Sequence, residues 1–201
     1  MQQFIARYRI GISRAWFLLV LILILLTRHI WPDPGLVTLA TGAVGFVFIT
    51  IAALGRLWSS IYICGYKNRR VIQDGPYSIV RNPLYVFSLF GAVGIGMITH
   101  SVAITALIVL FFVWIYPITV ANEERKLEEM LGQEYLDYKA RTPRFIPAFA
   151  QFSNVEQYTI NMPQLQNAFL DALWFFLGYG LLQGVDSLQS AGMLPVVGLL
   201  P

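Results

Sequence analysis

The sequence predicts an all-α protein, a polytopic membrane helix bundle of about five transmembrane helices with a polar pocket at one end. Hydrophobic residues make up 57% of the chain and charged residues only 12%, about half the charged share of a soluble domain. Several apolar runs approach the roughly 20 residues that a spanning helix needs. The basic residues fall in segments that alternate with these runs, a pattern typical of polytopic membrane proteins.

The first span is predicted from Ala15, whose unbroken apolar run reaches Leu26 and continues through Trp31. Basic residues precede it, as they precede a signal peptide. The segment that follows the run, 31–34, is Trp-Pro-Asp-Pro, which is not a small-residue cleavage site. We therefore expect the chain to stay in the membrane from its first helix onward.

Four further spans follow from apolar runs of similar character, at residues 36–57, 84–98, 101–120 and 168–185. The short link 99–101 makes the third and fourth spans a tight antiparallel hairpin. The tail 191–201 is apolar but covers only about half a crossing. We expect it to be a re-entrant stub or to lie at the outer interface.

Orientation follows from the basic residues, because cytoplasmic segments of membrane proteins carry an excess of Lys and Arg. With the N-terminus inside, all of the 14 Lys and Arg residues except Arg28 fall on the cytoplasmic side. The sequence thus predicts an integral membrane protein with a cytoplasmic N-terminus. The net charge of +3 reflects this topology, and no basic cluster suggests nucleic acid as a partner.

The two histidines and the single cysteine do not suggest chemistry. Cys64 excludes an internal disulfide and a multi-cysteine metal site, and we interpret it as a small buried thiol. His29 and His100 fall at predicted outer ends of spans, where polar tips at the interface are expected. No spacing of His and Cys predicts a bound metal ion.

A cytoplasmic amphipathic helix is predicted over Glu123–Arg141, with a kink at Gly132. Tyr135 and Tyr138 share its apolar face, and we expect them to lie on lipid or on the bundle itself. The glycines of the third span, residues 91, 94 and 96, are interpreted as close-packing positions between helices.

Two polar segments, 77–85 and 122–124, flank the predicted hairpin on the same side. They bring a guanidinium, an amide, two phenols and two carboxylates to a lipid–water boundary, where such groups are costly unless they are used or paired. A guanidinium binds a carboxylate bidentately, and carboxylates accept from hydroxyl or ammonium groups. The pocket therefore suits a small zwitterion with a fixed positive charge, and S-adenosylmethionine has all these parts.

The sequence resembles the isoprenylcysteine carboxyl methyltransferases and the related membrane phospholipid methyltransferases. The likeness covers about Arg56 to Pro147 and rests on two motifs in order. One is Gly-Pro-Tyr-x-x-x-Arg-His-Pro-x-Tyr, here Gly75 to Tyr85; the other is a Glu-Glu pair followed by Leu-x-x-x-(Phe/Leu)-Gly-x-Glu-Tyr-x-x-Tyr, here Glu123 to Tyr138. We predict a single integral membrane domain over 1–201, with a methyltransferase-like core at 56–147 and a C-terminal helical extension at 148–201.

The resemblance also implies that S-adenosylmethionine is the cofactor, bound on the cytoplasmic side, with Glu123 matching the family's cofactor-binding glutamate. It names no catalytic residue. The chain departs from the family at Asn82, which replaces a histidine, and at Thr119, which replaces a substrate-contacting arginine. The predicted cofactor-binding residues are Val71, Ile72, Tyr77, Arg81, Asn82, Pro83, Leu84, Tyr85, Glu123 and Glu124.

The function predicted from these observations is S-adenosylmethionine-dependent methyl transfer to a lipophilic, membrane-partitioning acceptor. Because Thr119 offers no cationic anchor, we expect a neutral or amine-bearing acceptor to be favoured over an anionic one. Two alternatives stay open: a phospholipid amine N-methyltransferase, and a non-enzymatic transporter subunit or scaffold. Transporters usually show internal repeats and mid-membrane polar groups, and the sequence shows no repeat and few such groups.

Overall fold

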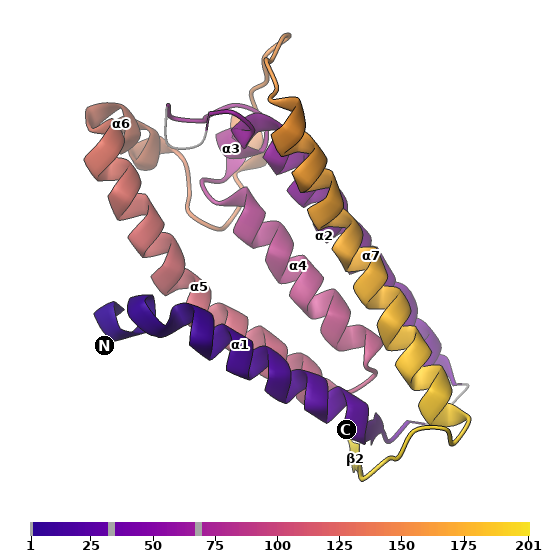
Figure 1. Cartoon of the computed structure of the whole chain (residues 1–201). Helices are drawn as coiled ribbons and strands as arrows, with labels where there is room; N and C mark the ends of the chain where they lie inside the picture. The colour runs from indigo at the N-terminus through magenta and orange to yellow at the C-terminus, as the bar shows by residue number, and fades with distance from the viewer. Residues whose placement is uncertain (1, 32–34, 67–69) are drawn as a thin grey trace.

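Three long and two shorter apolar helices make up most of the described part of the computed structural model, which covers residues 2–31, 35–66 and 70–201 (Figure 1). By length and composition α2, α5 and α7 can cross a membrane, while α4 and the apolar part of α1 are shorter. Each predicted span coincides with one of these helices, so the predicted all-α membrane bundle is confirmed. The bounds are α1 Gln2–Leu26, α2 Leu36–Ile63, α4 Pro83–Ile98, α5 Val102–Leu131 and α7 Met162–Ser190.

The remaining elements are short. The predicted helix over Glu123–Arg141 is in fact the end of α5 followed by a separate helix, and the break falls at Gly132 as expected. Gly132 has a φ of 59°, a left-handed conformation that favours glycine. These elements are α3 Pro76–Ile79, α6 Gln133–Arg141, the 3-10 helix η1 Phe149–Gln151, and the strands β1 Thr27–His29 and β2 Gly198–Leu200.

Close packing of α2 against α4 forms the centre of the bundle, and glycines make it possible. A Cβ atom on Gly94 would lie 2.7 Å from the carbonyl oxygen of Gly45, so the two backbones nearly touch. A Cβ atom on Gly96 would lie 2.8 Å from Cα of Thr105 in α5, and one on Gly91 would overlap the ring of Phe175 in α7. The predicted packing role of the third-span glycines is confirmed.

The shortness of α4 creates a recess at one end of the bundle. At about 1.5 Å per residue the 16 residues of α4 span only about 24 Å. Arg56 of α2 donates to the carbonyl oxygen of Leu84 at 3.4 Å, so α2 continues for residues 57–63 beyond the start of α4. Helix α5 likewise continues to Leu131. We call this end of the bundle the pocket end.

The opposite end, which we call the sheet end, is closed by the C-terminal tail. Strand β2 pairs in parallel with β1, and the carbonyl oxygen of Pro201 accepts from the backbone of Ala103 and the hydroxyl of Ser101. Sequence analysis did not predict this pairing, because it joins two short segments that lie far apart in the sequence. The tail crosses the end of the bundle instead of re-entering between the helices (Figure 1).

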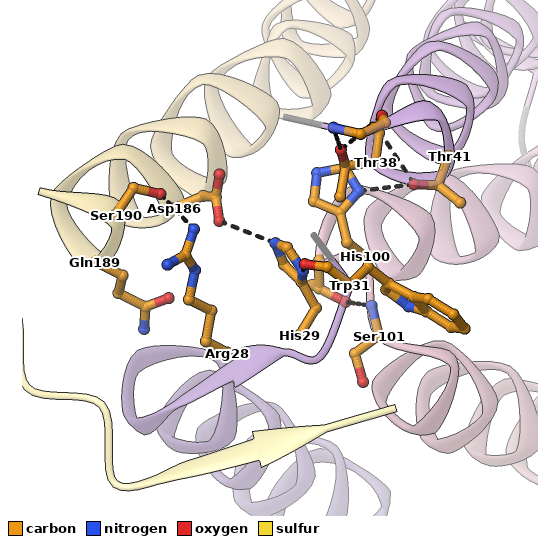
Figure 2. Close-up of polar contacts among 12 residues, drawn as sticks. Arg28, His29, Trp31, Thr38, Thr41, His100, Ser101, Asp186, Gln189 and Ser190 are labelled. Carbon is orange, nitrogen blue, oxygen red and sulfur yellow. Dashed lines mark hydrogen bonds and ion pairs between the residues drawn. The ribbon is translucent and has the colours of Figure 1, made fainter. Parts of the chain in front are cut away.

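Both histidines lie at the sheet end in a buried polar cluster (Figure 2). The Nε2 atom of His29 lies 3.7 Å from Oδ1 of Asp186 in α7, and Nδ1 of His100 lies 2.7 Å from the hydroxyl of Thr41 in α2. Their rings meet edge to face with centroids 5.1 Å apart. They are therefore not exposed interfacial tips, but contacts that hold β1, α2, α7 and the α4–α5 link together.

Cys64 directly follows α2 and is buried, as predicted. Burial raises the pKa of its thiol, which keeps the thiol protonated and unreactive at neutral pH.

Candidate functional site

A cavity of about 520 Å³ fills the recess at the pocket end, a size typical of small-molecule sites. Its walls come from the end of α2, the segment leading through α3 to α4, the extension of α5, and α6. Nine of the ten predicted site residues line it: Val71, Ile72, Tyr77, Arg81, Asn82, Pro83, Leu84, Tyr85 and Glu123. The tenth, Glu124, lies behind the wall.

The turn that positions Tyr77 depends on Gly75. Its φ of 57° lies in the left-handed region, and a Cβ atom there would overlap the ring of Tyr62. Pro76 then starts the single turn of α3, and Pro83 occupies the first turn of α4, where its missing N–H costs nothing. This chain path turns Tyr77 inward and buries it.

The hydroxyl of Tyr77 is the unusual polar group of the cavity. Its oxygen is buried and has no hydrogen-bond partner among the described residues. Burial raises the pKa of this phenol, so the group remains a neutral hydroxyl that can donate and accept. A buried hydroxyl without a partner costs free energy, which a ligand in the cavity can recover.

The adjacent carboxylates Glu123 and Glu124 have different surroundings because successive residues on a helix point about 100° apart. Glu123 is exposed and lines the cavity. Glu124 is only 2% exposed and accepts from three side chains. Its oxygens lie 3.1 Å from Nε of Arg81, 3.0 Å from Nδ2 of Asn82, and 3.0 and 2.5 Å from Nε and Nη2 of Arg144.

Arg81 is held in place by the chain itself. Besides Glu124, its Nη1 donates to the carbonyl oxygens of Lys139 and Thr142, each at 2.7 Å. Three of the five guanidinium N–H donors are used in this way. In the described part of the molecule only Nη2 makes no hydrogen bond, so Arg81 keeps two donors for a ligand while it fixes the exit of α6.

Asn82, where the resemblance implied a histidine, takes part in the same network. Its amide donates to Glu124 at 3.0 Å and to the carbonyl oxygen of Arg144 at 3.4 Å. Its role in this structure is to connect the start of α4 to α5 and to the segment after α6.

Tyr135 and Tyr138 line the cavity, although sequence analysis placed them outside the site. Both are buried against Val71, and the hydroxyl of Tyr138 donates to the carbonyl oxygen of Tyr77 at 2.7 Å. Their shared helical face was visible in the sequence, but not its packing partner. The other lining residues that were missed are Arg56, Ile63, Arg70, Ser88, Tyr116, Lys126, Leu127, Met130 and Leu131. A charged residue near the end of an apolar run, such as Arg56, was a usable signal.

A second cavity, of about 730 Å³, lies between α1 and α5. It meets the first at Tyr85 and Tyr116, which line both and whose rings pack edge to face with centroids 4.9 Å apart. No sequence signal could reveal it, because it joins helices about a hundred residues apart. It is lined by Ser13, Arg14, Phe17, Leu18, Tyr85, Phe111, Phe112, Ile115, Tyr116 and Thr119.

No group of three or more His, Cys, Asp or Glu side chains is arranged to hold a metal ion within the described ranges.

Comparison with known proteins identifies the family. The family model described as phospholipid methyltransferase matches residues 34–134, which is half of the chain. The chain belongs to the phospholipid methyltransferase family. The match includes α2, α3, α4 and α5, and so contains the two segments that form the site, whereas α1 and α7 lie outside it. The predicted resemblance is confirmed.

Two curated relatives match along their length. The chain is 34% identical over 201 residues to the nickel-cobalt-cadmium resistance protein NccN of Alcaligenes xylosoxydans xylosoxydans, covering 100% of the chain and 93% of that protein. It is 33% identical over 201 residues to the cobalt-zinc-cadmium resistance protein CzcN of Cupriavidus metallidurans, covering 98% of the chain and 90% of that protein. No solved structure matches significantly.

Proposed function

We propose that the chain is an integral membrane methyltransferase that takes its methyl group from S-adenosylmethionine and transfers it to a lipophilic, membrane-partitioning acceptor. Membership of the phospholipid methyltransferase family supports methyl transfer. The observation that supports the cofactor is the cavity itself. It combines the carboxylate of Glu123 with two groups that form no hydrogen bond among the described residues, the buried hydroxyl of Tyr77 and Nη2 of Arg81.

These groups match the parts of the cofactor. Arg81 Nη2 offers two donors to a carboxylate, and Glu123 accepts from hydroxyl or ammonium groups. The hydroxyl of Tyr77 can donate a hydrogen bond to a carboxylate or accept one from a hydroxyl or ammonium group. Tyr135, Tyr138 and the aliphatic side chains beside them form an apolar and aromatic wall of the kind that a purine base requires.

The chemistry requires positioning more than acid–base catalysis. When bound, S-adenosylmethionine supplies a methyl group on a sulfonium sulfur, which leaves as a neutral thioether. The protein then has to hold the acceptor in line with that methyl group and keep water out. Glu124, Arg81 and Arg144 do this indirectly, because their network fixes the walls of the recess. The Tyr85–Tyr116 pair lies where the two cavities meet and is well placed to orient an acceptor.

A phospholipid amine is the second candidate acceptor, and the family name favours it. An amine acceptor must lose a proton, whereas a carboxylate or thiolate acceptor does not. In that alternative the carboxylate of Glu123, which lines the cofactor cavity, accepts the proton.

The names of the two relatives refer to resistance to nickel, cobalt, cadmium and zinc. We infer that this chain contributes to metal resistance through methylation of a membrane molecule, because the polar groups of the pocket end line a small-molecule cavity.

The direct test is methyl transfer from S-adenosylmethionine labelled in its methyl group into an organic-soluble product. Purified protein in detergent is incubated with a lipid extract, and the product is separated by chromatography. We expect label in one lipid-like species, which Glu123→Gln reduces and Glu129→Gln does not, because Glu129 is exposed and does not line the cavity. If no more label reaches the lipid fraction than in a sample without protein, the proposal is contradicted and the non-enzymatic scaffold alternative is favoured.

A further inference from the structure

The segment between α6 and α7 carries exposed apolar side chains at the pocket end. Ile146 is 82% exposed and Phe149 is 74% exposed, and Phe152 follows at 52%. They belong to neither of the two cavity linings described above. A group of large apolar side chains on one surface indicates a binding site for a partner or for lipid. We call residues 143–152 the apolar loop.

Hydrogen bonds fix the apolar loop along the wall of the cavity at the pocket end. The backbone N–H of Arg81 donates to the carbonyl oxygen of Pro143 at 2.8 Å, and that of Ala148 donates to the carbonyl oxygen of Ile79 at 2.9 Å. Ile79 is the last residue of α3, and Arg81 lies just before α4. The loop is therefore a fixed part of the bundle, and its apolar side chains are held in one place.

The depth of the apolar loop in the membrane follows from its contact with α2. The ring of Phe152 packs against that of Trp58, with centroids 6.3 Å apart, and Trp58 lies in the last two turns of α2. Because the 28 residues of α2 exceed the roughly 20 that cross the hydrocarbon, these last turns lie where the acyl chains meet the head groups. A non-helical loop cannot lie deeper, since its backbone groups would lack hydrogen-bond partners in the hydrocarbon. The loop therefore lies at this boundary.

Basic residues accompany the apolar ones. Residues 139–152 include Lys139, Arg141 and Arg144 and contain no Asp or Glu. Arg141 is exposed, and the side chain of Arg144 remains 39% exposed although it binds Glu124. Apolar side chains beside basic ones are typical of segments that insert into an anionic leaflet, where acyl chains and phosphate groups lie at adjacent depths. This combination favours lipid over a protein surface as the occupant.

We propose that the apolar loop is a lipid-binding surface: Ile146 and Phe149 insert among the acyl chains of the leaflet at the pocket end, and Arg141 contacts an anionic head group. Arg141 donates through Nη2 to the side-chain oxygen of Gln73 at 2.6 Å and has further N–H groups for a phosphate oxygen. The lipid holds the loop, and the loop holds α3, which carries Tyr77. The leaflet thus supports one wall of the cavity. This lipid contact does not require that the protein transfers methyl groups.

Spin labels measure whether the loop reaches the acyl chains. In a Cys64→Ala background a nitroxide is attached at Ile146→Cys or Phe149→Cys, and the whole chain is placed in bilayer discs of phosphatidylcholine and phosphatidylglycerol. Collision of the label with oxygen, which concentrates among acyl chains, is compared with its collision with a water-soluble nickel chelate. We expect both labels to favour oxygen several-fold more than a label at Glu129→Cys does, because Glu129 is exposed at the same end and lines neither cavity.

The head-group contact is tested by removing the anionic lipid. In discs of phosphatidylcholine alone the oxygen preference of both labels should fall, and Arg141→Gln should cause the same fall in the mixed discs. Arg125→Gln is the matched control, because Arg125 is exposed at the same end and lies outside the loop, and it should leave the preference unchanged. An oxygen preference that Arg141→Gln does not change would overturn the contact of Arg141 with lipid.

Two results would overturn the insertion itself. Labels at Ile146 and Phe149 that favour the nickel chelate, as the label at Glu129 does, would place the loop in water. Labels that neither reagent reaches would mean that a protein surface, such as a second copy of this chain, covers the loop instead of lipid.

Discussion

At the scale of single residues, the pocket end separates side chains that hold the structure from side chains that face the cavity. Glu123 and Glu124 show this most clearly, since one lines the cavity and its neighbour is buried between two arginines. Sequence analysis placed both in the same site because it could not see the rotation of α5 about its axis. Tyr77 and Tyr138 form a similar pair: the hydroxyl of Tyr77 has no hydrogen-bond partner in the described part of the chain, whereas that of Tyr138 donates to a backbone carbonyl.

Tyr77→Phe should change stability and ligand affinity in opposite directions. Removing a buried hydroxyl without a partner should leave the free energy of unfolding unchanged or raise it by about 1 kcal/mol. Affinity for S-adenosylmethionine should fall by about three- to tenfold, the value of one neutral hydrogen bond. Thermal unfolding and calorimetry measure the two effects. Tyr138→Phe is the control and should lower stability, because it removes a hydrogen bond made within the chain. A less stable Tyr77→Phe variant with normal affinity would place that hydroxyl outside the site.

Glu124→Gln should destabilise the protein by about 3 kcal/mol, because it leaves the buried guanidinium of Arg81 without its carboxylate and removes the partner of the partly exposed Arg144. Glu123→Gln should change the free energy of unfolding by less than about 0.5 kcal/mol, as expected of an exposed side chain. The comparison is made by denaturant unfolding in detergent. Equal effects of the two substitutions would contradict the division of roles between these neighbours.

At the scale of elements, helix packing sets the depth of the site. The glycine contacts bring α2 and α4 together, and the short α4 leaves room for the cavity between the longer helices. The apolar runs and the Gly-Pro and Asn-Pro breaks predicted these helices and their order. The strand pair β1–β2 and the α1–α5 cavity could not be predicted, because they join segments that are far apart in the sequence and carry no local signal.

Gly94→Ala should weaken the bundle, since its Cβ atom would lie 2.7 Å from the carbonyl oxygen of Gly45. Overpacking of this kind costs about 1–3 kcal/mol. Gly178→Ala in α7 meets no atom within 4 Å and should leave stability unchanged or raise it by up to about 1 kcal/mol, through better helix propensity. Unfolding temperatures of the two variants in the same detergent provide the measurement. A Gly94→Ala variant as stable as wild type would mean that α2 and α4 are not packed at this point.

At the scale of the whole molecule, charge is distributed unevenly between the two ends of the bundle. Arg28 lies at the sheet end, whereas Arg56, Arg70, Arg81 and Lys126 line the cavity at the pocket end. We infer from this asymmetry that the pocket end faces the cytoplasm, which is where S-adenosylmethionine is supplied. The acceptor would then reach the site from the bilayer and the cofactor from water.

Reporter fusions test this orientation. A reporter that works only in the cytoplasm should be active when it is fused after Arg144. A reporter that works only outside the cytoplasm should be active when it is fused after Ser190, at the end of α7. The reverse pattern would place the cavity on the outer side and remove its access to cytoplasmic S-adenosylmethionine.

The central claim is that the cavity at the pocket end binds S-adenosylmethionine, and calorimetric titration of the purified protein tests it most directly. We expect saturable binding at one site, weakened about 30-fold or more by Glu123→Gln, because a lost charged partner of a ligand typically costs about 2–5 kcal/mol. Glu129→Gln, an exposed carboxylate of the same helix that lines no cavity, should bind as wild type does. A folded wild-type protein without measurable binding, or equal affinities of wild type and Glu123→Gln, would contradict the account.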